Sequence, residues 1–144
     1  MIERDYIMRM LQDFFSMIAK MLRLKMEEPD MTRVQAYIND LYKQFFRHTA
    51  EHFYAMEQEA ILEGLKNDNL SESEQDAMMQ MLAELLYQDG LIKIDRAEKI
   101  SLLEKSLFLF KYLDSNSKTF SWDREQKIGD IHNILTEYDI NGLQ

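Results

Sequence analysis

The sequence predicts an all-α fold, an antiparallel array of about six helices forming a single domain over residues 1–144. The first observation is that the chain contains one proline and four glycines, too few for the tight turns that a sandwich or barrel requires. The second is an abundance of Leu, Glu and Met, which favour helices. The third is that apolar residues recur at helical spacing from the first residues nearly to the last.

The first predicted helix runs from about Arg4 to Leu24, within an N-terminal amphipathic segment over residues 1–25. Its apolar row recurs every three or four residues and therefore lies on one face. That row consists of Ile7, Leu11, Phe14, Ile18 and Met21. Further apolar residues widen this face beyond a single stripe. Pro29 forces a break, and the remaining array is expected over residues 30–140.

The second predicted helix spans Thr32 to Phe46, with Asp30 or Thr32 as its cap. A third is predicted from Thr49 to Leu65. Because no strong helix breaker separates the two, one long bent helix is an alternative to two separate ones.

The second half of the chain predicts three more helices. Ser71 followed by Glu74 forms a capping box that opens the fourth, and Gly90 is expected to end it as a left-handed cap. The fifth runs from about Asp95 to Leu113. Ser121 caps the sixth. The polar loops before the fourth and the sixth helix are expected over residues 66–69 and 114–119.

The fourth and fifth predicted helices resemble a tetratricopeptide helix pair. The first helix of that repeat carries a large, a small and a large residue, as at Leu82, Ala83 and Leu86. The second carries a large residue and then a small one, as at Leu103 and Ser106. The resemblance implies close packing of the two helices. The link after the first helix is longer than in the repeat, and no proline closes the second.

The opening segment, Met1 to Met10, also resembles the start of an uncharacterised family of bacterial proteins. That resemblance implies a bacterial, cytoplasmic setting and no activity. The apolar stretch from Phe14 to Leu24 is interrupted by charges and is too short to span a bilayer, so a signal peptide or membrane span is not expected. The absence of cysteine excludes disulfide scaffolds and thiolate metal sites.

Charge argues against nucleic acid as a partner, since the net charge is −9 and phosphate binding needs clustered Lys and Arg. The charge is unevenly distributed. Residues 1–25 contain five basic and three acidic residues, a net charge of +2, which leaves −11 for the remainder. A basic first helix is therefore expected to precede an acidic body.

The strongest motif for chemistry is His48-Thr49-Ala50-Glu51-His52. Two histidines four residues apart on one helix face can hold a zinc ion, and the order H-x-x-E-H matches the inverted zinc-protease motif with Glu51 as general base. The alternative interpretation is a pair of ordinary surface histidines. A zinc-dependent hydrolase is therefore the alternative hypothesis. We expect no cofactor, since glycine-rich phosphate loops and the other nucleophile motifs are missing.

The leading hypothesis is a non-enzymatic protein–protein interaction or scaffolding module with a groove between helix pairs. Aromatic side chains are typical of such surfaces. The candidate interaction residues are Phe14, Ile18, Met21, Tyr87, Phe108 and Tyr112. For the first helix three roles remain open: packing in the core, a homodimer seam, or membrane-surface binding. The last would use Arg4, Arg9, Lys20 and Arg23.

Overall fold

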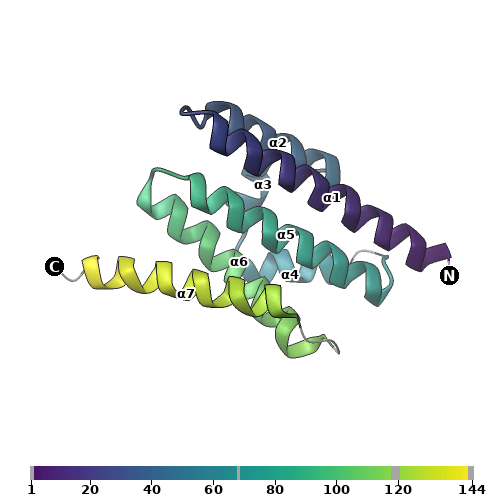
Figure 1. Cartoon of the computed structure of the whole chain (residues 1–144). Coiled ribbons are helices and arrows are strands. Elements are labelled where there is room, and N and C mark those ends of the chain that lie inside the picture. Colours follow the sequence, from purple (N-terminus) through teal and green to yellow (C-terminus); the bar gives the residue numbers. More distant parts are fainter. Residues whose placement is uncertain (1, 68, 118–120, 143–144) are drawn as a thin grey trace.

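The computed structural model describes residues 2–67, 69–117 and 121–142. In these residues the chain forms helices and no strand, which confirms the predicted all-α array (Figure 1). The helices are α1 (Ile2–Glu27), α2 (Thr32–Phe46), α3 (Ala50–Tyr54), α4 (Gln58–Asn67), α5 (Glu72–Ile92), α6 (Arg96–Asn116) and α7 (Trp122–Gly142).

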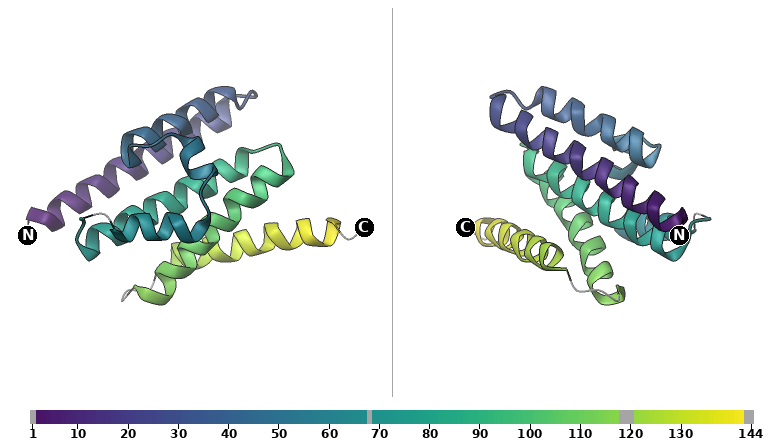
Figure 2. Two further views of the ribbon diagram at one scale, coloured as in Figure 1. Left: turned by 180° about the vertical axis from the view of Figure 1, so that it is seen from behind. Right: turned by 45° about the vertical axis from the view of Figure 1, so that its right-hand side comes forward.

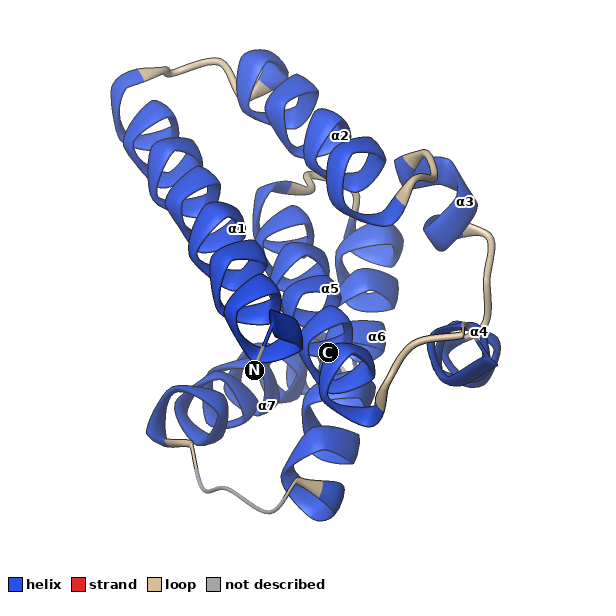
Figure 3. Cartoon of the chain, turned by 90° about the vertical axis from the view of Figure 1, so that its right-hand side faces the viewer, coloured by secondary structure: helices blue, strands red, loops and turns tan. Residues whose placement is uncertain are grey.

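The helices form two antiparallel pairs and a C-terminal helix. The first pair is α1 with α2, the second is α5 with α6, and α7 packs mainly on α6 (Figure 2). The short helices α3 and α4 connect the two pairs along the side opposite α1 (Figure 3). Since α5 contacts α1, α2, α4 and α6, it is the central helix of the fold.

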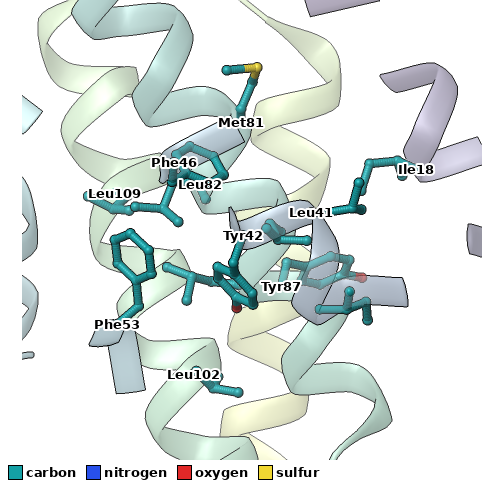
Figure 4. Close-up of a cluster of buried hydrophobic side chains, with 14 of the residues drawn as sticks. Ile18, Leu41, Tyr42, Phe46, Phe53, Met81, Leu82, Tyr87, Leu102 and Leu109 are labelled. Atoms are coloured by element: carbon teal, nitrogen blue, oxygen red, sulfur yellow. The ribbon is translucent and has the colours of Figure 1, made fainter. Parts of the chain in front are cut away.

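The core gathers side chains from both pairs and from α3 (Figure 4). The ring of Phe14 on α1 packs edge to face with that of Phe45 on α2, with 5.2 Å between the centroids. Tyr42 stacks on Phe53 of α3, with centroids 5.6 Å apart. Every residue of α5 from Met81 to Gly90 is buried. A helix that is apolar on so many sides is expected to lie inside the fold.

Helices α5 and α6 approach each other closely at small residues. The Ser106 hydroxyl donates a hydrogen bond of 2.7 Å to the Ala83 carbonyl. A Cβ on Gly90 would lie 3.0 Å from Cδ2 of Leu103. Gly90 therefore makes room for the neighbouring helix. The prediction that it ends α5 as a left-handed cap is wrong, since α5 continues to Ile92 and no described glycine has a positive φ. The resemblance to a tetratricopeptide pair stays a prediction.

The boundaries of α2 agree with the sequence, but the long third helix predicted over Thr49 to Leu65 is wrong. Arg47 ends α2 in the left-handed conformation, with φ 60°, so α2 and α3 are separate. The chain breaks again between Tyr54 and Gln58, which divides the predicted helix into α3 and α4. No proline or glycine marks this second break, which depends on tertiary contacts described below.

The predicted caps are largely confirmed. Ser71 accepts a hydrogen bond from the backbone N–H of Glu74, and Ser121 accepts one from that of Arg124. At α2 the prediction of Asp30 or Thr32 as cap is wrong, since the residue at the cap position is Met31, whose side chain makes no capping hydrogen bond. Asp30 instead accepts hydrogen bonds from the N–H and hydroxyl of Thr32. The predicted loops over residues 66–69 and 114–119 include residues 68, 118 and 119, which lie outside the described residues.

Candidate functional site

A buried carboxylate on α5 organises one end of the molecule. Asp89 is fully buried, and it accepts hydrogen bonds from the hydroxyl of Tyr42 on α2, at 2.8 Å, and from that of Tyr54 on α3. The amide of Gln35 donates a third, at 3.1 Å. A buried carboxylate is stable only when it is fully hydrogen-bonded. We call Asp89, Tyr42, Tyr54 and Gln35, together with Lys93, the Asp89 cluster.

Lys93 supplies the positive charge of this cluster. Its Nζ lies 3.5 Å from the Asp89 carboxylate and donates a hydrogen bond of 2.8 Å to the side-chain oxygen of Gln35. It also lies over the ring of Tyr54, 4.8 Å from the centroid. Burial, followed by the charge on Asp89, raises the pKa of the Tyr54 hydroxyl. Tyr54 is therefore held neutral as a hydrogen-bond donor.

A second lysine fixes the end of α3. The buried Lys105 of α6 donates hydrogen bonds to the backbone carbonyls of Phe53, at 3.3 Å, and Tyr54, at 2.7 Å. A lysine at a helix C-terminus satisfies carbonyls that the helix leaves unpaired. Burial lowers the pKa of Lys105, although the charge on Glu57 opposes this. Lys105 therefore stabilises the end of α3 at the break before α4.

Two adjoining pockets lie between α6 and the segment that these contacts position. The first, of about 280 Å³, is largely apolar and is lined by Tyr54, Lys93, Ala97, Glu98, Ser101 and Leu102. The second, of about 220 Å³, is polar and is lined by Glu57, Gln58, Glu59, Ser101, Glu104 and Lys105. Ser101 belongs to both, so the pockets continue along α6. We call them together the α6 groove.

The charge of the α6 groove is acidic. Four exposed carboxylates line it, and within the described part of the chain none forms an ion pair. These are Glu57, Glu59, Glu98 and Glu104. The two lysines of the lining are already engaged, since Lys93 pairs with Asp89 and Lys105 with backbone carbonyls. The groove thus offers an apolar pocket beside unpaired negative charge.

The structure corrects the argument for a zinc site at His48-x-x-Glu51-His52. His48 precedes α3, so the two histidines do not share a helix face. Their rings nevertheless stack, with centroids 3.9 Å apart. Both histidines and Glu51 are exposed. Burial, followed by the charge of His48, lowers the pKa of His52. No group of three side chains that could hold a metal ion occurs among the described residues.

The interaction residues predicted on the first helix lie in the core. Phe14 and Met21 are fully buried, and Ile18 is nearly so, because this row packs against α2 and α5. They are therefore not exposed to a partner in this fold, whereas a homodimer through the first helix stays a prediction. Core packing is the role that the structure assigns to them.

The other predicted residues do not line the groove. Tyr87 is buried, and the Nζ of Lys127 on α7 lies 5.2 Å from its ring centroid. Phe108 and Tyr112 are half-buried, and Lys66 of α4 lies over the ring of Tyr112. They share a helix face with Ala97 and Ser101, nearer the N-terminus of α6. Phe108 and Tyr112 therefore lie further along the same face of α6, outside the lining of the groove, and their role in binding stays a prediction.

One member of the Asp89 cluster could have been identified from the sequence, although a search for apolar residues at helical spacing passes over it. Asp89 continues the inward row of Leu82, Leu85 and Leu86 at helical spacing. A carboxylate in an apolar row indicates a buried polar contact. Tyr42 and Tyr54 could not be assigned to it, since the pairing depends on how α2 and α3 pack on α5.

No known family model matches this chain, and neither a curated protein nor a solved structure does. Among the described residues, no helix combines the length and apolar character that crossing a bilayer requires.

Proposed function

We propose that this chain is a non-enzymatic protein–protein interaction or scaffolding module, and that the α6 groove is its binding surface. The observation that supports this most is the pairing of an apolar pocket with four carboxylates that form no ion pair among the described residues, two on α6 and two on the facing α3–α4 link and α4. A groove between helices can accept an amphipathic segment that places apolar anchors in it. Charges at its rim steer the partner and select against acidic ones.

The walls of the groove support this role because they are fixed before any partner arrives. Asp89 holds Tyr54 and Lys93 in place, and Lys105 of α6 holds the carbonyls of Phe53 and Tyr54 at the end of α3, where the link to α4 begins. A preformed groove loses less conformational entropy on binding than a flexible one.

The proposal includes the bacterial, cytoplasmic setting expected from the sequence, which is supported by the opening segment and the charged first helix. Under this proposal the pair His48 and His52 has no chemical role, and binding needs no cofactor.

Site-specific photo-crosslinking in cells tests the proposal. A photoreactive residue at Ser101, in the centre of the groove, should yield discrete crosslinked proteins. The same residue at Asn133, exposed on α7, should not. Charge reversal by Glu57→Lys with Glu104→Lys should remove those products. Equal yields from both positions, or products that persist after charge reversal, would contradict a binding role for the groove.

A further inference from the structure

The exposed face of α1 carries apolar side chains that the fold does not use. Met8 is 50% exposed, Leu22 is 40% exposed and Met26 is 87% exposed. Their helical spacing places the three on one side of α1, away from the buried row that includes Phe14 and Met21. Single exposed apolar residues need no explanation, but Leu22 and Met26 lie one helical turn apart and form an exposed apolar pair, with Met8 further along the same side, which indicates a contact surface.

Basic side chains border this row. Arg9, Lys20 and Arg23 are exposed, and none of them forms an ion pair within the part of the chain that the structure describes. They belong to the segment over residues 1–25, whose net charge of +2 contrasts with −11 for the rest. We call Met8, Leu22, Met26, Arg9, Lys20 and Arg23 the α1 face.

The α1 face is complementary to the α6 groove in apolar surface and in charge. Its methionine and leucine side chains match the largely apolar first pocket, and methionine adapts readily to irregular pockets. Its three cations match the unpaired carboxylates along the second pocket. From this match we propose that the groove binds the α1 face of a second copy of the chain. This inference rests on the proposed function of the groove.

The positions of the two surfaces determine the kind of assembly. Helix α1 lies on one side of the molecule and α3 and α4 on the other, with α5 and α6 between them (Figure 3). The α1 face therefore cannot reach the groove of its own copy. A contact between two different surfaces is heterologous, so a pair of copies still offers one free groove, on one copy, and one free α1 face, on the other. The copies associate head to tail.

Sedimentation velocity over a dilution series tests this with two blocking variants. Ser101→Trp fills the groove and keeps the α1 face, whereas Arg9→Glu with Arg23→Glu reverses the α1 face and keeps the groove. The wild type should gain mass with concentration and lose it with added salt, because screening weakens the ion pairs. Each variant alone should associate at least about tenfold more weakly. An equimolar mixture of the two should recover dimers and nothing longer.

Matched controls separate this result from effects of charge or folding. Lys43→Glu with Lys111→Glu makes the same charge change at exposed positions elsewhere, and Asn133→Trp adds the same bulk on α7. Both should associate as the wild type does. Circular dichroism and urea unfolding should show that all variants stay folded.

Three outcomes would overturn the inference. The first is a wild type that stays monomeric at every concentration, the second is blocking variants that associate normally, and the third is a mixture that recovers no dimer. Flotation with vesicles containing phosphatidylserine tests whether the α1 face binds membranes instead. If the wild type is monomeric and floats with the vesicles, and Arg9→Glu with Arg23→Glu abolishes this, the α1 face is a membrane-binding surface and self-docking is rejected. A monomeric wild type whose Ser101 position still crosslinks another protein would retain the proposed function and reject self-docking.

Discussion

Two buried polar clusters lie on α5 and differ in how completely their hydrogen bonds are satisfied. In the Asp89 cluster the carboxylate accepts from two tyrosine hydroxyls and an amide, beside a lysine. In the second, Glu84 pairs with Lys127 of α7 at 2.9 Å and accepts from the Gln88 amide at 3.3 Å. The side-chain oxygen of Gln88 is buried without a partner.

The comparison separates contacts that fix the arrangement of several helices, in the Asp89 cluster, from contacts that attach only α7, in the Glu84 cluster. The Asp89 cluster joins α2 and α3 to α5, and it forms a wall of the α6 groove. The Glu84 cluster joins α5 to α7, in which Ile131 is the only buried side chain among those described. A satisfied network specifies one arrangement, whereas a partly satisfied one adds less stability.

The largest effect is expected from Asp89→Ala. It leaves the hydroxyls of Tyr42 and Tyr54 and the charge of Lys93 without their common partner, so the free energy of unfolding should fall by about 3–5 kcal/mol. Urea unfolding measures this. Removal of an exposed carboxylate on α2 by Asp40→Ala should change it by no more than about 0.5 kcal/mol. Equal losses from the two substitutions would refute an anchoring role for Asp89.

A smaller loss is expected from Lys127→Met in the second cluster. The methionine keeps the apolar stem of the lysine but leaves the buried Glu84 carboxylate without a cation, at a cost of about 1–3 kcal/mol. Gln126→Met, at an exposed neighbouring position, serves as the control. If Lys127→Met destabilised the protein more than Asp89→Ala does, the ranking of the two clusters would be reversed.

Alkaline pH should also weaken the Asp89 cluster. Burial, followed by the charges of Asp89 and Tyr54, raises the pKa of Tyr42 above its ordinary 10.0. Above pH 10 the unfolded chain therefore loses a proton that the folded chain keeps, and the free energy of unfolding falls as the pH rises. The slope from one such group approaches about 1.4 kcal/mol per pH unit.

Comparison with Tyr42→Phe isolates this contribution. Burial opposes the charged form of Lys127, but its pKa is raised as well by the charge and hydrogen bond of Glu84 together with the charge of Asp123 and the neighbouring Tyr87. Its stabilisation is present below pH 10.5 and is lost as the pH rises through the higher folded pKa, in the same direction as for Tyr42. A slope above pH 10 that is identical in wild type and Tyr42→Phe would contradict the assignment to Tyr42.

The smallest effect is expected from Gln88→Met. Its buried oxygen has no partner, and methionine replaces the amide with apolar bulk of similar length. Removal of the unsatisfied oxygen is favourable, whereas loss of the 3.3 Å hydrogen bond that the amide donates to Glu84 is unfavourable. Because these two effects oppose each other, stability should change by less than about 1 kcal/mol. Thermal unfolding at fixed pH detects this, and a loss as large as that of Lys127→Met would indicate that the Gln88 oxygen has a partner.

The sequence predicted the helices wherever local signals set them. The limits of α2 follow from Pro29 before it and the apolar row within it, and the caps at Ser71 and Ser121 follow from local hydrogen bonds. Such signals act within a few residues, so one sequence is enough to identify them.

The parts that the sequence left unpredicted depend on residues far apart in the chain. The break after Tyr54 is stabilised by Lys105, 51 residues further on. The role of Gly90 depends on Leu103 of the next helix. The groove requires α3, α5 and α6 to be packed before its lining can be known. Periodicity indicates which face of a helix is apolar but does not identify the residues that cover it.

Hydrogen exchange at low and high protein concentration tests the central claim most directly, because it reports both docking surfaces in one measurement. If the α1 face docks in the α6 groove, exchange should be slower at high concentration in α1 and in residues 97–105 of α6. Exchange in α2 and α7 should be unchanged, and the difference should be absent in Ser101→Trp. Exchange that is independent of concentration, or protection confined to other helices, would contradict docking of the α1 face in the α6 groove.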